Sequence, residues 1–505
     1  LKALNVDDEK FPPRELQYFI NANKEEGRRP KDAEAYDDFS RRMVELYKAY
    51  EEQCQREGVV DFAELLLRSY ELLSNDEVLR EHYRERFKFV LVDEFQDTNR
   101  LQYRWLKLIA GGGAEGRFAS SGGESEGRFA SSGGGTIFAV GDDDQSIYAF
   151  RGAHAGNMQD FQRDFGVKHL IKLEQNYRSH GNILDAANTL IRNNRGRLGK
   201  ELWTDAGAGE PIRVYAAPSD NAEAAFIVDE VKALRNDGWN LSDMALLYRS
   251  NAQSRVLEHA LFSSAIPYRV YGGLRFFERM EVKHCLAYLR LAANQDDDGA
   301  FLRVVNFPPR GLGARSIEQL QEAAEKAGVS LMQASTAHNP LSARAAAALQ
   351  GFVQIIERLK QSATSITLPE LVEEALELSQ LRTHYKTEKE GADRVENLNE
   401  LVNAAAVFVQ EEDDNDLTTF LAHASLESGE NQATEGSDAV QLMTVHSAKG
   451  LEFHTVFITG MEEGLCPHEQ SVNEDDGLEE ERRLMYVAIT RARTRLYLSF
   501  AQTRM

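Results

Sequence analysis

FKFVLVDEFQDTNRLQ, residues 87–102, joins an apolar run to a cluster of polar side chains. The run FVLV (89–92) is rich in β-branched and aromatic residues, as strands are, and Asp93 and Glu94 follow it directly. Two adjacent carboxylates at the end of a buried strand are costly unless a cationic group meets them. The stretch therefore predicts a buried strand with a functional site at its end, and it poses the question of which cation is the partner.

The segments on either side of this stretch differ in the spacing of their apolar residues. Residues 1–85 have helical spacing, as in DAEAYDDFSRRMVELYKAYEEQ (32–53). Residues 275–440 are again mostly helical in pattern. Short strand-like runs alternate with helical segments elsewhere: FVLV (89–92), TIFAV (136–140), HLIKL (169–173), MALLY (244–248), VQLMTV (440–445), TVFITG (455–460) and RLYLSF (495–500). This alternation predicts an open α/β sheet, with a helical block inserted into its second part.

Length and composition restrict the class of protein. A chain of 505 residues with 42% hydrophobic and 28% charged residues is expected to form roughly three or four globular domains. No secretory signal and no apolar stretch of membrane-spanning length is present. The net charge of −23 argues against coating nucleic acid by bulk electrostatics but leaves room for a local binding cleft. Cys54, Cys285 and Cys466 are far apart, which argues against a disulfide framework or a zinc site and fits a reducing cytoplasm.

The motif Asp93-Glu94-Phe95-Gln96 suggests phosphate chemistry. An acid directly after a strand can hold Mg²⁺, and the next acid can orient a water molecule for attack on a γ-phosphate. In open α/β sheets, ligands bind beyond the carboxyl ends of the strands, where this motif is expected. The alternative is an ordinary carboxylate pair that caps the following helix, and the motif alone does not separate the two.

The stretch VGDDDQSIYAFRGA (140–153) follows the next strand-like run. Gln145 offers an amide that can sense a phosphate. Tyr148, Phe150 and Arg151 combine alternate aromatic side chains with an arginine, which is a platform on which nucleic-acid bases stack. The alternative is that the two aromatic residues belong to the core, but the polar residues around them make simple burial less favoured.

Two later motifs offer groups that suit a nucleotide. In EQNYRS (174–179), Tyr177 can stack on a purine ring and Arg178 can reach a phosphate with its planar guanidinium. In TVHSAKGLEF (444–453), Glu452 can accept a hydrogen bond from a ribose. Each motif is short and carries little meaning by itself.

Two further motifs are expected at the ends of helices. ERRLMYVAITRARTR (481–495) places Arg491 at the end of an amphipathic helix, from which an arginine can stabilise transition-state charge. NFPPRGLGARS (306–316) contains Gly311 and Gly313, whose backbone N–H groups can meet a duplex phosphate. A plain turn between two helices explains the glycine motif equally well.

Together, and in this order, these motifs resemble those of the superfamily I DNA helicases of the UvrD/Rep/PcrA type. The resemblance covers nearly the whole chain and includes LLYRSNAQSR (246–255), YGGLRFFER (271–279) and RRLMYVAITRAR (482–493). It implies an α/β fold with two RecA-like motor domains of the P-loop-NTPase type, each interrupted by a helical insertion. It also implies an ATP- and Mg²⁺-dependent 3′-to-5′ helicase and single-strand translocase, active at single-/double-strand DNA junctions in repair or replication restart.

The resemblance further implies an organisation, residue roles and a setting. The segments would be part of a first helical insertion (1–86), part of the first motor domain (87–174), the second motor domain (175–274 and 440–505) and a duplex-contacting helical insertion (275–439). By the resemblance, the Mg²⁺-associated acid would be Asp93, the catalytic base would be Glu94, and the γ-phosphate sensors and arginine finger would be Gln145, Arg178 and Arg491. The adenine would contact Tyr177 and the ribose Glu452. The single strand would contact Tyr148, Phe150, Arg151 and His446, and the duplex would contact Gly311 and Gly313. The family often has Trp where this chain has Phe150. The expected setting is a bacterial cytoplasm near the nucleoid, as a monomer or weak dimer with repair-protein partners.

The sequence departs from the family pattern in two places. No GxxxxGK[ST] phosphate-binding loop occurs: Gly199-Lys200 is followed by Glu201. We therefore expect the loop upstream of a chain that is a segment of a longer protein. EGRFASSGG also occurs twice, at 115–123 and 126–134, and predicts a flexible surface loop.

Two rival hypotheses remain open. The first is a DNA-binding module without ATP turnover, because the phosphate loop is absent. The second is a helicase–nuclease of the recombination type, which would need nuclease carboxylates that the sequence does not display.

Overall fold

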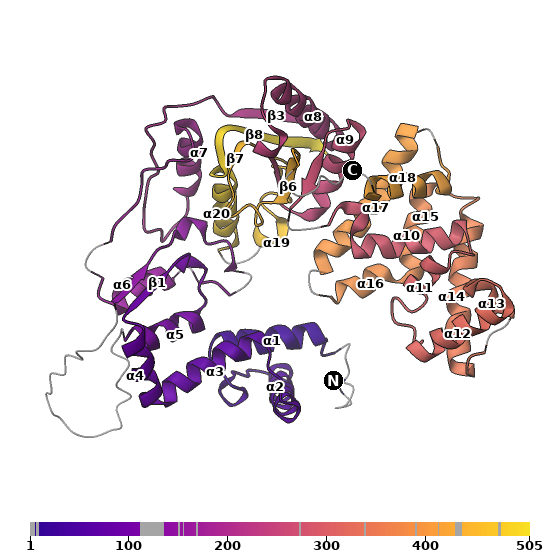
Figure 1. Cartoon of the computed structure of the whole chain (residues 1–505), viewed down its shortest axis with the longest axis horizontal. Helices are drawn as coiled ribbons and strands as arrows, with labels where there is room; N and C mark the ends of the chain where they lie inside the picture. Colours follow the sequence, from indigo (N-terminus) through magenta and orange to yellow (C-terminus); the bar gives the residue numbers. More distant parts are fainter. Residues whose placement is uncertain are drawn as a thin grey trace. The chain divides into compact units, whose positions relative to one another are not determined.

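Figure 1 shows the computed structural model of the chain. Its residues group into two compact units. The described residues are 6, 10–111, 136–149, 152–154, 156–167, 170–271, 274–337, 340–388, 391–412, 414–429, 437–472 and 476–504. Unit 1 comprises Leu1–Tyr177, Leu184–Gly207 and Gln470–Val487, and unit 2 comprises Arg178–Ile183, Ala208–Glu469 and Ala488–Met505. The repeat at 115–134 lies outside the described residues. The five-segment organisation expected from the sequence stays a prediction.

Unit 1 begins with helices, as the spacing of apolar residues predicts. They are α1 (Pro13–Glu25), α2 (Asp38–Glu57), α3 (Phe62–Asn75) and α4 (Glu77–Arg86). Acidic side chains begin three of them: Asp37, Asp61 and Asp76 each accept a hydrogen bond from a backbone N–H of the first turn. The caps fix where the helices start.

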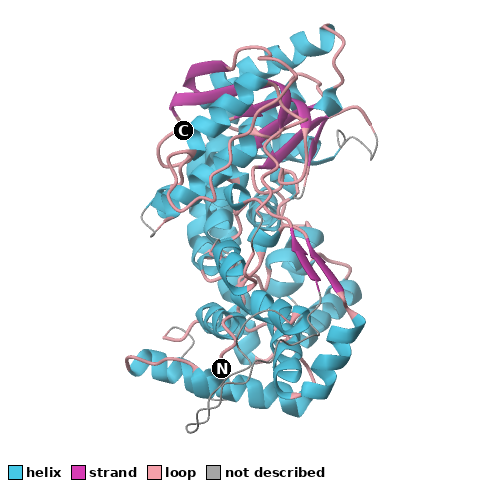
Figure 2. Cartoon of the chain, turned by 90° about the vertical axis from the view of Figure 1, so that its left-hand side faces the viewer, coloured by secondary structure: helices cyan, strands magenta, loops and turns pink. Residues whose placement is uncertain are grey.

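The sheet described in unit 1 has two parallel strands, β1 (Phe89–Val92) and β2 (Thr136–Ala139) (Figure 2). α5 (Arg100–Ala110) and α6 (Asn157–Asp164) supply apolar side chains that pack on Val90 and Val92. Phe89 and Leu91 point the other way and are each 75% exposed. The expectation of a buried strand is therefore wrong for this face, because no described segment of unit 1 covers it.

The other strand-like run expected here behaves differently. Residues 170–173 of the predicted strand HLIKL form no strand, and a single bridge joins Gln175 to Trp203. α7 (Gly181–Ile191) and α20 (Gly477–Ile489) are the remaining helices with residues in this unit, together with most of the short α19 (Glu469–Val472).

Unit 2 contains a six-stranded parallel sheet in the order β3-β8-β7-β4-β6-β5. Its strands are β3 (Arg213–Ser219), β4 (Met244–Tyr248), β5 (Tyr268–Val270), β6 (Val440–Thr444), β7 (Phe453–Ile458) and β8 (Ala492–Thr503). The four runs predicted in this part of the chain are strands, whereas β3 and β5 were not predicted. β4 is buried along its whole length, and α8 (Asp220–Asn236) and α9 (Ser254–Ser263) pack on the sheet.

The chain between β5 and β6 is helical, as predicted. Its helices are α10 (Met280–Ala293), α11 (Asp298–Val304), α12 (Ala314–Ala327), α13 (Leu331–Ala337), α14 (Ala343–Ser362), α15 (Leu368–Ser379), α16 (Leu381–Lys386), α17 (Gly391–Glu412) and α18 (Leu417–Gly429). Residues on α10 such as Cys285, Tyr288 and Leu289 are buried at the centre of a single apolar core. The three cysteines are free thiols. No helix among the described residues is long and apolar enough to cross a bilayer.

Candidate nucleotide and DNA site

The loop after β1 presents two exposed carboxylates. Glu94 adopts a left-handed backbone conformation (φ 49°), and its N–H donates to Asp93 Oδ1 at 2.9 Å. Both side chains are exposed, so neither carries the desolvation cost expected for a buried strand end. Exposed carboxylate oxygens are the donor type that Mg²⁺ binds, and Asp93 and Glu94 therefore fit this ion chemically.

Gln96 joins this loop to the loop after β2. It is 1% exposed; its Nε2 donates to Glu94 Oε2 at 2.6 Å and its Oε1 accepts from Asp142 N at 2.9 Å. A Cβ on Gly141 would lie 2.6 Å from Gln96 Oε1, so this approach requires glycine. Gln96 belongs to the motif at 93–96, but its role depends on these contacts and is not visible in the sequence.

Asp142 orients the predicted phosphate sensor. Its Oδ2 accepts from Gln145 Nε2 at 2.6 Å and forms an ion pair with Lys200 Nζ. The amide of Gln145 is thereby held close to the strand end that carries Asp93 and Glu94. Lys200, which was rejected as part of a phosphate-binding loop, is a partner of the acidic loop instead.

The other two aspartates are also satisfied by the basic run at 192–200. Arg197 donates twice to Asp144, at 2.6 Å from Nε and 2.6 Å from Nη2, and Leu198 N donates to Asp143 Oδ2 at 2.7 Å. Burial raises the pKa of the Asp144 carboxyl despite this pairing. The three acids therefore have structural partners, and the charge of the basic run was the signal that could have identified them.

The predicted stacking platform is only partly described. Tyr148 is half-buried, and its carbonyl accepts from Ala153 N at 3.2 Å. Phe150 and Arg151 lie outside the described residues. The role of these three residues in gripping a single strand stays a prediction.

In unit 2, Arg178 and Glu452 form a close ion pair. Arg178 Nε donates to Glu452 Oε2 at 2.6 Å, and Arg493 Nη1 lies 3.8 Å from Glu452 Oε1. The hydrogen bond from Arg178 lowers the pKa of the Glu452 carboxyl. The structure thus joins two predicted nucleotide contacts and adds Arg493, which the sequence analysis did not select.

Arg491 and Tyr177 differ strongly in exposure. Arg491 follows α20, is 2% exposed, and donates from Nη1 to Leu451 O at 3.1 Å and from Nη2 to Thr490 Oγ1 at 3.1 Å. Tyr177 is 85% exposed, and in unit 1 its hydroxyl donates to Gln175 Oε1 at 2.8 Å. The tyrosine ring is open to a stacking partner, whereas the guanidinium of Arg491 is held within its own unit.

The predicted DNA contacts of unit 2 lie in turns. His446 is half-buried and follows β6. Gly311 (φ 84°) and Gly313 precede α12, in a turn where Asn306 Oδ1 accepts from Arg310 N at 2.8 Å and Leu312 N at 3.1 Å. The protein's own hydrogen bonds therefore shape the turn. A Cβ on either glycine would meet nothing within 4 Å, so the backbone is also open to a ligand.

Comparison with known proteins matches the chain to two family models. The UvrD/REP helicase N-terminal domain matches residues 1–166, and the UvrD-like helicase C-terminal domain matches residues 171–503. The chain is 49% identical to DNA helicase II of Escherichia coli over 513 residues, which covers all of this chain and 68% of the relative. It is 40% identical to ATP-dependent DNA helicase UvrD1 of Mycobacterium bovis and 38% identical to ATP-dependent DNA helicase PcrA of Bacillus subtilis, each over the whole chain and 67% of the relative.

Proposed function

Because the chain belongs to the UvrD/REP family of helicases, we propose that it is a 3′-to-5′ DNA helicase that translocates along single-stranded DNA. Its enzyme class is that of an ATP-dependent DNA helicase. The α/β fold class with RecA-like motor domains and helical insertions is confirmed by the same matches.

The observation that carries the proposal is the amide bridge of Gln96. It ties Glu94 to the loop that holds Gln145, so a general base and a phosphate-sensing amide come from two neighbouring parallel strands. Ligands of parallel α/β sheets bind beyond these strand ends. A bridge at this place allows changes at the phosphate to be transmitted from one loop to the next.

Each predicted residue has a task that matches its chemistry. Asp93 would hold Mg²⁺, which supplies positive charge to the phosphates when it is bound. Glu94 accepts a proton from the attacking water, and Gln145 positions the terminal phosphate. Tyr177 stacks on the base through its exposed ring.

Unit 2 supplies arginines whose chemistry also suits a nucleotide. Arg178 stabilises negative charge on the phosphates while Glu452 accepts from the ribose, and their ion pair supports both orientations. Arg491 acts as the finger that stabilises transition-state charge, which requires its bonds to Leu451 and Thr490 to rearrange.

The DNA contacts and the cellular setting extend the proposal. Tyr148, Phe150, Arg151 and His446 grip the single strand, and Gly311 and Gly313 approach the duplex at a junction. We place the activity in repair or replication restart in a bacterial cytoplasm, with repair proteins as partners. These assignments rest on the family resemblance and the chemistry of the side chains.

ATP hydrolysis by the 505-residue chain, with and without single-stranded DNA, tests the proposal beside a Glu94→Gln control. DNA-stimulated turnover that is lost in the control supports the helicase assignment. No turnover, with strand-length-dependent DNA binding retained, supports a binding module instead, which the absence of GxxxxGK[ST] in these residues favours.

A further inference from the structure

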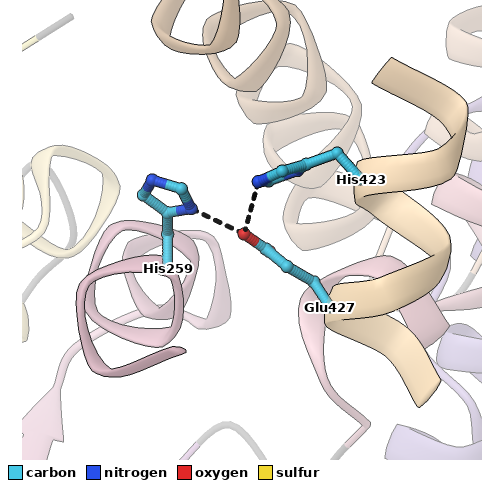
Figure 3. A group of neighbouring side chains, drawn as sticks. All are labelled: His259, His423 and Glu427. Atoms are coloured by element: carbon cyan, nitrogen blue, oxygen red, sulfur yellow. Dashed lines mark hydrogen bonds and ion pairs between the residues drawn. The ribbon is translucent and has the colours of Figure 1, made fainter. Parts of the chain in front are cut away.

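We propose that His259, His423 and Glu427 form a site for one transition-metal ion of the Zn²⁺ class. These residues lie in unit 2, have no part in the proposed helicase reaction and belong to none of the motifs described above. The site joins α9, next to the sheet, to α18, the last described helix before β6 (Figure 3).

The three side chains converge on one point. His423 and Glu427 lie one helical turn apart on α18 and face the ring of His259 on α9 (Figure 3). Glu427 Oε1 lies 2.6 Å from His259 Nδ1 and 3.5 Å from His423 Nε2. All candidate donor atoms lie within 4.8 Å of one another. Tetrahedral Zn²⁺ with bonds of about 2.0–2.2 Å places its donors about 3.3–3.6 Å apart, so small side-chain rotations are enough.

The surroundings suit a mostly buried site in which the protein fills three coordination positions and leaves the fourth for water. Glu427 is 5% exposed, and the apolar side chains of Phe277, Phe408 and Phe420 border the same cavity of about 20 Å³. A cavity of about 10–15 Å³ or more has room for a single water, which would be the fourth ligand of the ion. Two imidazoles and one carboxylate are a ligand set that Zn²⁺ accepts.

The hydrogen bonds of His423 and the pairing of nearby cations also bear on the site. His423 Nδ1 is buried and has no hydrogen-bond partner among the described residues, so no second bond fixes the tautomer of its ring. Arg255 also borders the cavity, but its guanidinium pairs with Glu400. Arg275 Nη1 donates to Glu427 O at 3.1 Å, and its guanidinium pairs with Glu278. Both cations near the site thus have carboxylate partners, which reduces their repulsion of a metal ion.

Zn²⁺ titration of the untagged chain by calorimetry, with thermal unfolding in parallel, tests the site. We expect one ion per chain and a higher Tm with Zn²⁺, because an ion that binds only the folded state stabilises it. His259→Ala and His423→Ala should each weaken binding by about 100-fold or more, since even the loss of a group that only supports a ligand weakens metal binding by about 10–100-fold.

His384→Ala is the matched control. His384 Nε2 also contacts a glutamate one turn away, Glu388 at 3.1 Å, but no third ligand group joins this pair among the described residues. The affinity of the His384→Ala variant for Zn²⁺ should equal that of the parent chain. His259→Gln, with a metal-free Tm and circular dichroism spectrum like those of the parent, separates loss of a ligand from loss of folding. Absence of stoichiometric binding, or equal affinity in the parent and the His259 variants, would overturn the proposal and leave a hydrogen-bonded triad.

Discussion

Gln96 Nε2 lies 2.6 Å from Glu94 Oε2, so a buried amide fixes the orientation of an exposed carboxylate. The same side chain accepts from the backbone of Asp142. Gln96, which is not expected to contact a ligand, thus orients the side chain of Glu94, the predicted general base.

Replacing Gln96 by Ala should lower kcat for ATP hydrolysis by about 10–100-fold. A hydrogen bond to a charged group contributes about 1.5–3 kcal/mol, and each 1.4 kcal/mol corresponds to about tenfold in rate. KM should change less than kcat, because the lost contact orients Glu94 and touches no substrate. Steady-state kinetics measure both values. An unchanged kcat in a folded variant would contradict the role given to the bridge.

Arg197→Ala should destabilise unit 1 by about 3–5 kcal/mol, because it leaves Asp144 buried and unpaired. Urea unfolding of the variant beside Arg197→Ala/Asp144→Asn measures the effect. The double variant should recover part of the loss, since the uncompensated charge is then removed. If the double variant is less stable than Arg197→Ala alone, the aspartate has a stabilising partner other than Arg197.

The two glycines before α12 should respond differently to alanine. Gly311→Ala places a side chain at φ 84° and should destabilise the fold by about 1–2 kcal/mol. Gly313→Ala meets no atom within 4 Å and should leave the Tm unchanged. If the Gly313 backbone approaches a duplex phosphate, affinity for a single-/double-strand junction should fall about tenfold. Equal junction affinity in the parent and Gly313→Ala would indicate a plain helix–helix turn.

Unit 2 should lose stability in mild acid because of His284. Burial lowers the pKa of His284 to about 4, from an ordinary value of about 6.5. As the pH falls, the His284 imidazole of the unfolded chain is therefore protonated before that of the folded chain. The free energy of unfolding decreases between about pH 6.5 and about pH 4, by up to about 3 kcal/mol. His284→Gln should flatten this part of the profile while keeping a polar contact for the Tyr385 hydroxyl. Urea unfolding at pH 7 and pH 5 gives the comparison, and parallel profiles for parent and variant would contradict it.

The sequence predicted most elements, because helical spacing and apolar runs are local signals. The roles of the site residues stay predictions. It missed β3, whose run RVYAAPS contains proline and alanines, and β5, which has only three residues. Both become strands by pairing with distant segments, β8 and β6, and that tertiary preference is not visible locally. HLIKL shows the converse: its residues 170–173 look like a strand but pair with no strand among the described residues.

Local patterns also point to charged residues in short motifs more readily than to the residues that contact them in the fold. Asp93, Glu94, Arg178 and Glu452 stand in short motifs and were selected. Their neighbours Gln96 and Arg493 gain importance only through contacts of 2.6 Å and 3.8 Å that the fold creates.

The position of β8 between β3 and β7 has a consequence for biosynthesis. β3 pairs in the described sheet only with β8, which the ribosome delivers roughly 270 residues later. At a synthesis rate of about 5–20 residues per second, the edge of β3 stays unpaired for about 15–55 s. During that interval the nascent chain exposes a template for wrong strand pairing, and binding of a chaperone near 213–219 would protect it.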